Sequence, residues 1–299
     1  MTAMTRRQFA ALAGTALLAP RALSQVSATA PLVTRAIPAS GERLPAVGLG
    51  TAAVFSSDDA ATRRAAADVV RTLVDAGGRL IDTASTYGDA EAVLGKVVAA
   101  AHARDKVFVA TKLESPDAAE LQRSLARLAT SKIDLLQLHN VSDARQSLAQ
   151  FRAWKSQGIC RYVGITSTYR NDYAAVETVL AREKPDFVQI DYSLDNRLAE
   201  ERILPLAADV KAGVLTALPF GRGRLFRGVR DTPVPDWARE FADSWAQFFL
   251  KFLLGDARIT AVIPGTSNPA HMADNLGAMR GRLPDAAERK RMIEWLGTR

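Results

Sequence analysis

Residues 79–88 have the sequence RLIDTASTYG, in which a short apolar run leads directly into a group of polar side chains. Leu80 and Ile81 belong to a run too short for a helix, so the stretch predicts a buried strand. Asp82 falls where that strand would end, and Tyr87 follows on a loop. Taken alone, the pattern also fits an ordinary strand-loop-helix corner, in which Asp82 caps a turn and Tyr87 packs on the surface. Similar corners farther along the chain favour a functional interpretation.

Short apolar runs and helical-period stretches alternate along the whole chain. Strand-like runs occur at 46–50, 80–84, 107–113, 135–139, 162–167, 187–193, 214–219 and 261–265. Amphipathic helices are predicted at 59–76, 90–103, 117–130, 143–157, 171–182, 199–211, 237–254 and 269–279. Strands that are apolar on both faces, each followed by a helix, predict a parallel sheet covered by helices. Eight such units without a break in composition favour an α/β fold of the closed (β/α)8 TIM-barrel type.

An open, doubly wound sheet is the second possibility, and its usual glycine motif is missing. No Gly-x-Gly-x-x-Gly follows the first strand, and the nearest string, GRGRLF at 221–226, comes after the seventh. A short N-terminal β-hairpin is expected at 35–45, where Ser40 and Gly41 separate two apolar runs. A C-terminal helix completes the predicted fold.

The N-terminal residues 1–24 are not typical of a folded domain. Arg6 and Arg7 precede a weakly apolar run at 10–19, and the segment contains no acidic residue. This pattern predicts a twin-arginine signal peptide that is cleaved after Ser24, and cleavage near residues 27–30 would also be suitable. A frayed amphipathic helix would show a similar pattern. The run is too short for stable membrane insertion.

The domain organisation follows from this assignment. We expect a signal peptide at 1–24, a linker at 25–34 and a single barrel domain at 35–299, exported to the periplasm by the twin-arginine machinery. We also expect a monomer.

Composition excludes several classes of function. The formal net charge is +7, but the basic residues are dispersed and no basic run is interleaved with aromatic residues, so we expect no nucleic-acid partner. Cys160 is the only cysteine, which excludes an intramolecular disulfide. One cysteine and three scattered histidines do not form a metal motif, so no metal site is predicted.

In such a barrel the carboxyl ends of the strands form the active face. Asp82 ends the second predicted strand, Lys112 the third and His139 the fourth, and Tyr87 lies on the second loop. Asp82 with Lys112 could be a structural ion pair, and His139 could be a core histidine. Four titratable groups on successive strand ends are harder to explain structurally, because burying them carries a desolvation cost.

These four side chains suit proton delivery to a developing alkoxide. Tyr87 would be the proton donor, and a nearby Lys112 ammonium would lower the pKa of its phenol. Asp82 would hold Lys112 in place, and His139 would orient the substrate oxygen or relay a proton. The group contains no strong nucleophile and no carboxylate pair. A hydride donor is therefore the expected second component of the reaction.

From about residue 35 to 278 the chain resembles the aldo-keto reductase family. Together with the predicted signal peptide, the resemblance implies a bacterial, exported member of that family. The landmarks are GLGT at 48–51, DTASTYG at 82–88 with Glu91 and Leu-Gly at 94–95, Thr111 with Lys112, DLLQLH at 134–139, GITS at 164–167, IPG at 263–265, and Asp274 with Asn275. The resemblance implies that Tyr87 is the general acid of an NAD(P)H-dependent reduction of an aldehyde or ketone. It also implies that Lys112 and Asp82 tune the acid and that His139 positions the carbonyl.

The resemblance also implies binding residues for NADP or NAD, with NADP slightly favoured. Those for the nicotinamide carboxamide are Thr166, Ser167 and Gln189, and those for the pyrophosphate are Pro219, Phe220, Gly221 and Arg222. Those for the adenosine end are Gly265, Thr266, Ser267, Asn268, His271, Asp274 and Asn275. The implied substrate contacts are Phe55, Tyr87, His139 and Asn140.

Several positions depart from the family pattern. Ala217 stands where an aromatic ring usually stacks on nicotinamide, so the platform is missing or is provided by Phe220. Gly265 and His271 replace basic residues at the 2′-phosphate site, which weakens the case for NADP. Glu114 and Asn140 replace apolar or aromatic side chains, so we expect an open and polar pocket. The alternative hypothesis is an exported nucleotide- or ligand-binding barrel with little or no turnover.

Overall fold

The computed structural model describes residues 30–141 and 144–298. The predicted signal peptide at 1–24 lies outside the described residues, as does 25–29 of the predicted linker. The rest of that linker already joins the fold, because Leu32 forms a β-bridge with Arg280 and Val33 N donates to Met279 O at 2.7 Å. The folded chain therefore begins a few residues before the expected boundary at 35.

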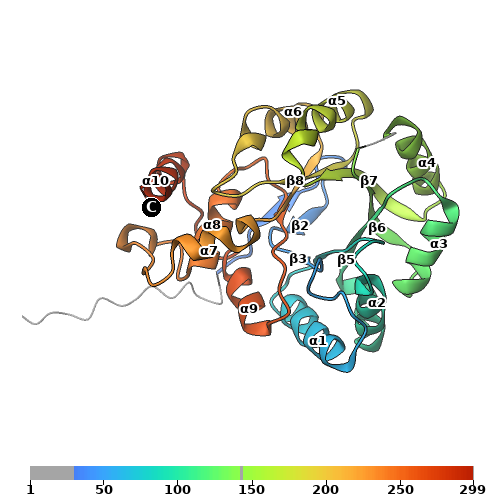
Figure 1. Cartoon of the computed structure of the whole chain (residues 1–299), viewed down its shortest axis with the longest axis horizontal. Helices are drawn as coiled ribbons and strands as arrows, with labels where there is room; N and C mark the ends of the chain where they lie inside the picture. The colour runs from blue at the N-terminus through green and yellow to red at the C-terminus, as the bar shows by residue number, and fades with distance from the viewer. Residues whose placement is uncertain (1–29, 142–143, 299) are drawn as a thin grey trace, which may run out of the picture.

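Eight parallel strands form one sheet in the order β10-β9-β8-β7-β6-β5-β4-β3. Their bounds are β3 Leu49–Gly50, β4 Leu80–Asp82, β5 Phe108–Leu113, β6 Ile133–His139, β7 Cys160–Ser167, β8 Phe187–Asp191, β9 Gly213–Ala217 and β10 Ala261–Val262. Parallel bridges from Val47 to Val262 and from Gly50 to Gly265 join the two end strands. The sheet is thus curled into a barrel, as predicted, and Figure 1 shows the helices surrounding it.

The helices follow the strands in the expected alternation. Their bounds are α1 Ala60–Asp75, α2 Ala90–Ala100, α3 Ala118–Arg127, α4 Ala144–Ser156, α5 Tyr173–Glu183, α6 Ile203–Asp209, α7 Arg224–Gly228, α8 Trp245–Leu254, α9 Pro269–Gly277 and the C-terminal α10 Ala286–Gly297. No helix among the described residues combines the length and apolarity needed to cross a membrane.

Two predicted helices begin too early. The stretch 237–254 contains a separate 3-10 turn at Asp236–Ala238, and α8 begins only after Ser244. Ser244 has an extended backbone, and its hydroxyl accepts a hydrogen bond from Gln247 N at 3.1 Å, so its side chain caps a new helix. The stretch 199–211 likewise divides into a 3-10 turn at Leu198–Glu200 and α6.

Alternation along the strands creates an inner and an outer core. Side chains two residues apart point to the same face, and one buried cluster fills the barrel interior. Its members are Ile37, Leu44, Leu80, Phe108, Ala110, Leu135, Tyr162, Phe187, Leu215, Ala217, Ala261 and Ile263. The same period places Asp82 two residues beyond Leu80 and Lys112 two beyond Ala110. Both polar side chains therefore stand on the inner face, nearer the carboxyl ends.

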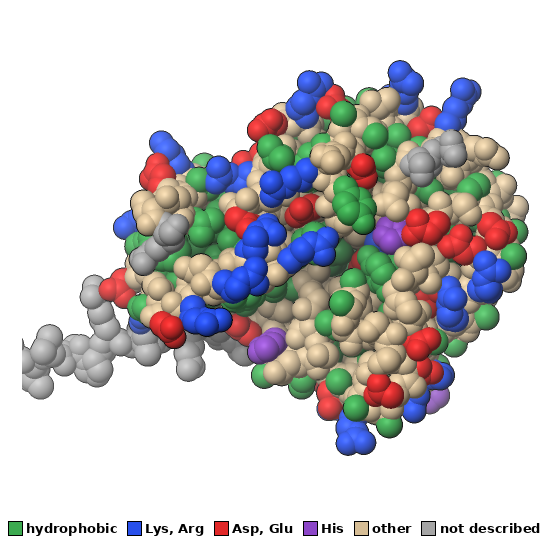
Figure 2. All heavy atoms as spheres, viewed as in Figure 1, with side chains coloured by type: hydrophobic (Ala, Val, Ile, Leu, Met, Phe, Trp, Pro, Cys, Tyr) green, Lys and Arg blue, Asp and Glu red, His purple; other side chains and the backbone are tan. Residues whose placement is uncertain are grey.

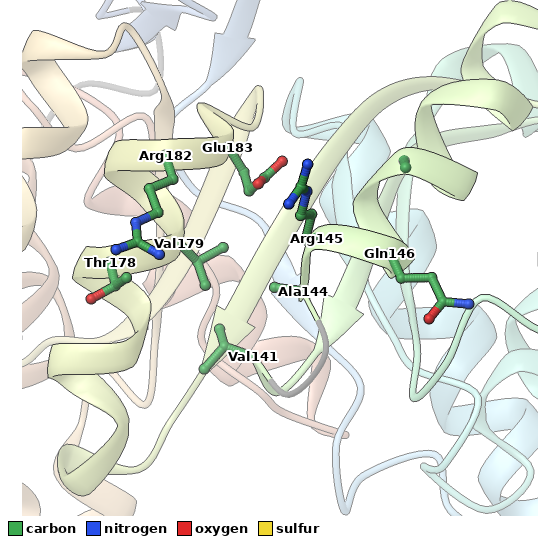
Figure 3. Close-up of a pocket in the computed structure, with 9 residues that line it drawn as sticks. Val141, Ala144, Arg145, Gln146, Thr178, Val179, Arg182 and Glu183 are labelled. Atoms are coloured by element: carbon green, nitrogen blue, oxygen red, sulfur yellow. The ribbon is translucent and has the colours of Figure 1, made fainter.

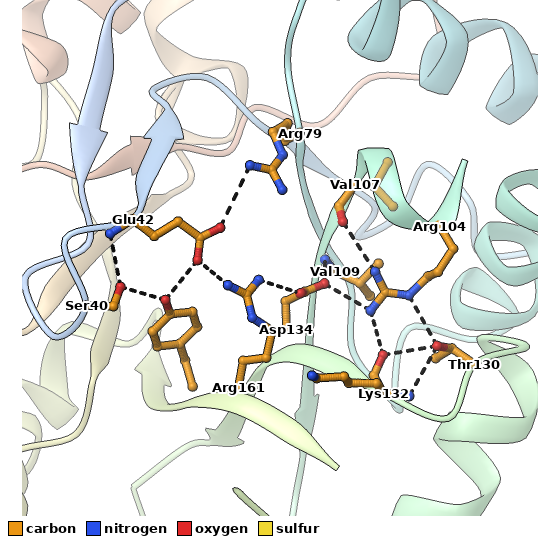
Figure 4. Close-up of polar contacts among 11 residues, drawn as sticks. Ser40, Glu42, Arg79, Arg104, Val107, Val109, Thr130, Lys132, Asp134 and Arg161 are labelled. Carbon is orange, nitrogen blue, oxygen red and sulfur yellow. Dashed lines mark hydrogen bonds and ion pairs between the residues drawn. The ribbon is translucent and has the colours of Figure 1, made fainter. Parts of the chain in front are cut away.

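The opposite end of the barrel is closed by the predicted hairpin, formed by β1 Thr34–Ala36 and β2 Arg43–Pro45. Glu42 accepts a hydrogen bond from the Tyr162 hydroxyl at 2.9 Å and pairs with Arg161. Arg161 in turn donates to Asp134 at 2.9 Å. Figure 4 shows this network joining the hairpin to the amino ends of the strands. Polar contacts at this end stabilise the barrel, and the carboxyl ends remain open for a site.

Candidate active site

A buried ion pair occupies the carboxyl end of the barrel. Lys112 Nζ donates to Asp82 Oδ2 at 2.5 Å and to Thr83 O at 2.8 Å, and both charged side chains are almost fully buried. The other carboxylate oxygen, Oδ1, accepts from Gln189 Nε2 at 2.7 Å and Gln137 Nε2 at 3.2 Å. These added hydrogen bonds offset part of the desolvation cost of a buried pair.

Gln137 was missed by the sequence reasoning. It lies on β6 between Leu135 and His139, on the same inward period as both, so strand alternation alone could have identified it. Its Oε1 is buried and has no hydrogen-bond partner among the described residues. Gln189, predicted only as a contact for the carboxamide, also supports Asp82.

Tyr87 lies next to the ion pair. Lys112 Nζ is 4.9 Å from the centre of the Tyr87 ring. The loop is fixed by Gly88, where the backbone is left-handed and an added Cβ would lie 2.5 Å from Ser56 O. Burial raises the pKa of the Tyr87 phenol, and the attraction of Lys112 opposes this only in part. The expectation that Lys112 would bring this pKa below its usual range is therefore wrong for the free protein, because desolvation is the larger effect.

His139 stands edge-on to Tyr87, with the ring centres 5.8 Å apart. Its Nδ1 lies 2.5 Å from Glu114 Oε1 and 3.3 Å from Thr86 Oγ1. Burial and the Lys112 cation lower the pKa of the imidazole, and Glu114 opposes them. His139 lines a cavity instead of lying sealed in the core. The structure thus brings all four predicted catalytic side chains together.

The cavity at this mouth has a volume of about 580 Å³. Asp82, Tyr87 and His139 line one part of it. The predicted cofactor residues that line it are Gln189, Pro219, Phe220, Arg222 and Gly265. Figure 2 shows Lys and Arg side chains gathered along one side of the central hollow. One cavity therefore joins the proton-donating group to an area with positive charge.

Two of the predicted carboxamide contacts have partners within the protein. Thr166 Oγ1 donates to Gln189 Oε1 at 3.2 Å, and Ser167 Oγ donates to Asp172 Oδ2 at 2.7 Å. Both hydroxyls are buried at the end of β7. Gly221, the remaining residue of the predicted pyrophosphate loop, is also buried.

The predicted adenosine-end residues other than Gly265 do not line the cavity. Asn268 Oδ1 caps α9 by accepting from Ala270 N at 2.9 Å, and Thr266 Oγ1 accepts from Asn268 N at 3.0 Å. Asp274 Oδ1 accepts from Ser244 Oγ at 2.8 Å and from Gln247 Nε2 at 2.9 Å. Asn275 is buried, whereas Ser267 and His271 are exposed. Several of these polar groups thus hold the local fold of α9.

Two of the four predicted substrate contacts do not reach the cavity. The Phe55 ring is fully buried in the hydrophobic core, so it presents no surface to a molecule in the mouth. Asn140 is half-buried, has a left-handed backbone and donates from Nδ2 to Glu114 Oε2 at 3.3 Å. Tyr87 and His139 line the cavity as expected.

Two aromatic side chains at the mouth were not predicted. Tyr169 is 61% exposed and Phe226 is 38% exposed, and both line the cavity. Phe226 packs against Phe220 with ring centres 4.8 Å apart, while Ala217 offers only a methyl group. The aromatic surface at the mouth therefore comes from the loops that carry Tyr169 and Phe220 and from the short helix α7 instead of from β9.

A larger hollow, of about 770 Å³, lies outside the barrel between α4 and α5. Figure 3 shows the side chains of both helices that border it, including Ala144 and Val179. None of the predicted functional residues line this hollow. Within the parts of the chain that are described, no cluster of His, Cys, Asp or Glu side chains could hold a metal ion.

The sequence matches that of a known protein family. A family model described as "Aldo/keto reductase family" matches residues 46–289. An aldo-keto reductase of Mycolicibacterium smegmatis is 31% identical over 249 residues, which is 78% of this chain and 81% of the relative. Methylglyoxal reductase YeaE of Escherichia coli is 29% identical over 255 residues, 81% of this chain and 88% of the relative.

The fold is also found among solved structures. An aldo-keto reductase of Klebsiella pneumoniae, in complex with NADPH, superposes with a TM-score of 0.74 at 23% identity, covering 89% of this chain and 96% of the other. A glycerol dehydrogenase of Gluconobacter oxydans gives a TM-score of 0.72 at 23% identity, covering 88% and 94%. Because the family model spans the barrel from its first strand to the start of its last helix, this chain belongs to the aldo/keto reductase family.

Proposed function

We propose that this protein is an oxidoreductase that reduces the carbonyl group of an aldehyde or ketone to an alcohol with a nicotinamide nucleotide as hydride donor. One cavity carries the proposal, because it joins two groups of residues. Tyr87, His139 and Asp82 line one part of it, and Gln189 and Arg222 line another part. Membership of a family whose curated relatives include a methylglyoxal reductase supports the same reaction class.

The residues of this cavity fit a nicotinamide nucleotide. Arg222 would attract the pyrophosphate, and the rings of Phe220 and Phe226 offer apolar faces for the nicotinamide. Gln189 lines the cavity and supplies an amide for the carboxamide, and Thr166 Oγ1 donates to Gln189 Oε1. NADP is the favoured form by family, although Gly265 and His271 supply little fixed positive charge for its 2′-phosphate.

The chain's own groups would supply the proton chemistry. When bound, the nicotinamide supplies a hydride equivalent to the carbonyl carbon. Tyr87 gives its phenolic proton to the carbonyl oxygen, which becomes the hydroxyl of the alcohol. Lys112 stabilises the phenolate that remains, and its hydrogen bond to Asp82 holds Lys112 in place. Gln137 and Gln189 hold the Asp82 carboxylate, so the buried charges stay fixed during the reaction.

We also propose that the protein acts in the periplasm as a monomer, after folding and export through the twin-arginine machinery. The basis is the Arg6-Arg7 pair followed by a short, weakly apolar run. Export of a folded protein is compatible with a cofactor bound beforehand. Fractionation of cells that produce the full chain tests this, with Arg6→Lys and Arg7→Lys together as the comparison. Equal amounts in the cytoplasm for both forms would contradict export.

A second candidate function is a barrel that binds a nucleotide or small ligand with little turnover. Ala217, Gly265 and His271 favour it, because each lacks a contact that would hold a nicotinamide nucleotide firmly. The two candidates differ in turnover. The purified protein should oxidise NADPH or NADH in the presence of some member of a broad panel of aldehydes and ketones. Binding of the nucleotide without oxidation across the panel would favour the second candidate, and neither binding nor oxidation would contradict both.

A further inference from the structure

We propose that Asp195, on the loop after β8, is a positioning residue that holds the loop after β9 in the shape in which Phe220 and Arg222 line the cavity. Neither Asp195 nor its partner Arg224 belongs to the residues that the sequence assigned to catalysis or binding. The role of this pair in the shape of the loop rests on its contacts. Its role in nucleotide binding rests in addition on the function proposed above.

The loop after β9, residues 218–223 and called here the β9 loop, has an unusual backbone. Leu218 and Arg222 both have a φ of 54°, and Gly221 and Gly223 have φ values of 56° and 80°. Glycine adopts a positive φ readily, whereas leucine and arginine rarely do. Such conformations persist only where the surrounding structure holds them. The β9 loop therefore depends on contacts that keep it in place.

The backbone of the β9 loop supplies some of these contacts. Gly221 N donates to Leu218 O at 2.8 Å, and Gly223 N donates to Phe220 O at 2.9 Å. These two hydrogen bonds form successive tight turns. Both join residues of the same loop, so they do not fix its position relative to the neighbouring loops of the mouth.

Asp195 makes a contact that does join two loops. Its Oδ2 accepts a hydrogen bond from Arg224 Nε at 2.9 Å, directly after the β9 loop, and its Oδ1 accepts one from Ser193 Oγ at 2.6 Å. Ser193 is fully buried, and its backbone exchanges two hydrogen bonds with that of Asn196, at 3.1 and 3.0 Å. One carboxylate therefore connects the end of the β9 loop to a fixed turn after β8.

Asp195 also lies against the middle of the β9 loop. A Cβ atom added to Gly221 would lie 2.7 Å from both carboxylate oxygens of Asp195, so the carboxylate leaves no room for a side chain there. Phe220 and Arg222, which line the cavity, are the two chain neighbours of Gly221. Asp195 itself does not line the cavity. It therefore supports the loop at the point between two cavity-lining residues.

The charge of Asp195 and its contacts predict opposite effects on nucleotide binding. A carboxylate repels the pyrophosphate, so removal of a residue that acted only through its charge would tighten binding. Removal of a residue that holds the β9 loop leaves the loop in its binding shape for only part of the time, which weakens binding in proportion. A residue that only stabilised the fold would not change the dissociation constant. The direction of the change therefore identifies a positioning role.

Limited proteolysis of the nucleotide-free protein tests the shape of the loop. Trypsin cleaves after arginine, and Arg222 is exposed in the β9 loop. In Asp195→Ala we expect cleavage after Arg222, identified by mass spectrometry, to be about tenfold faster, as loss of one hydrogen bond between charged groups implies. Glu177→Ala is the matched control, because it removes a carboxylate that pairs with Arg202 outside the cavity. It should leave the cleavage rate unchanged.

Fluorescence titration with NADPH gives the second measurement. The dissociation constant should rise by about tenfold in Asp195→Ala, because the loop is then in its binding shape for about a tenth of the time. Asp195→Asn should recover part of the affinity, since its amide oxygen can still accept one of the two hydrogen bonds. Glu177→Ala should bind NADPH as the parent protein does. Urea denaturation of each variant shows that it is folded.

Two results would overturn the proposal. One is an unchanged rate of cleavage after Arg222 in Asp195→Ala. The other is a dissociation constant for NADPH in Asp195→Ala that equals or falls below that of the parent protein. Faster cleavage of Asp195→Ala, in a protein that binds neither NADPH nor NADH, would support the contact between the loops while refuting its role in nucleotide binding together with the proposed function.

Discussion

The ammonium nitrogen of Lys112 lies 4.9 Å from the centre of the Tyr87 ring, yet burial still raises the pKa of that phenol. The cation therefore does not ionise Tyr87 in the free protein. It instead stabilises the phenolate once the proton has moved to the substrate. A neutral acid beside a buried ammonium group suits a single proton transfer in which the phenol starts protonated.

Replacement of Tyr87 by phenylalanine should separate catalysis from binding. The ring and its packing remain, while the transferable proton is lost, so kcat/KM for carbonyl reduction should fall by about 100- to 10,000-fold. Nucleotide binding, measured by fluorescence titration, should remain close to that of the parent protein. Retention of most of the turnover in Tyr87→Phe would contradict the assigned acid.

Tyr162→Phe provides a matched control at the opposite end of the barrel. The Tyr162 hydroxyl contacts Ser40 Oγ at 2.6 Å and Glu42 at 2.9 Å, far from the mouth. Its loss should lower the free energy of unfolding by about 1 kcal/mol, measured by urea denaturation, without a change in kcat. Equal losses of activity in both variants would indicate a general effect of removing a hydroxyl.

Lys112→Met should both inactivate and destabilise the protein. Lys112 and Asp82 are buried, so removal of the cation leaves an uncompensated carboxylate that keeps its hydrogen bonds from Gln137 and Gln189. Breaking such a pair costs about 3–5 kcal/mol of unfolding free energy, measurable with urea. Adding Asp82→Asn to Lys112→Met should recover part of the stability and none of the activity. A double variant no more stable than the single one would contradict this account.

The pH dependence of reduction should be flat across the neutral and mildly alkaline range. The Tyr87 pKa is raised from its usual 10.0, so the acid stays protonated there. The His139 pKa is lowered from 6.5, so the ring gains its second proton only below that value. We expect kcat/KM, measured with excess cofactor, to change little between these limits. A fall that begins between pH 7 and pH 9 would mean that Lys112 dominates the titration of the phenol.

Strand alternation explains how much of this site could be predicted from the sequence. Asp82, Lys112 and His139 end successive parallel strands, and the carboxyl ends of such strands meet at one rim, so their convergence follows from the fold class alone. Gln137 obeys the same rule and was overlooked only because an amide does not titrate. The aromatic surface of Tyr169 and Phe226 comes from the loop after β7 and from the short helix α7, whose positions depend on contacts far apart in the chain.

Residues on loops were predicted less well for the same reason. Phe55 belongs to the loop after β3, and its burial depends on packing against distant elements that no local pattern encodes. The break before α8 was missed because the apolar period continues across Ser244, although the serine hydroxyl caps a new helix. The adenosine-end contacts remain predictions. In the structure the side chains of Asp274 and Asn268 already have hydrogen-bond partners within the fold.

His271→Arg should shift the choice of cofactor towards NADPH. His271 is exposed in the first turn of α9, at the position that the resemblance assigns to the 2′-phosphate. An arginine there would form a bidentate, charge-assisted hydrogen bond with the 2′-phosphate of NADPH. NADH has a neutral 2′-hydroxyl instead and would gain much less from the arginine. The ratio of kcat/KM for NADPH to that for NADH should rise about tenfold, the equivalent of roughly 1.4 kcal/mol. The added cation near a helix N-terminus should cost only about 0.3–1 kcal/mol of stability.

His102→Arg is the control for that change, because it adds the same charge at an exposed histidine before β5, on the closed side of the barrel. It should leave the ratio unchanged. Equal shifts in both variants would mean that total charge alone attracts NADPH. No shift in either would mean that the 2′-phosphate lies away from α9, and Arg222 or its neighbours at the mouth would then be the next residues to test.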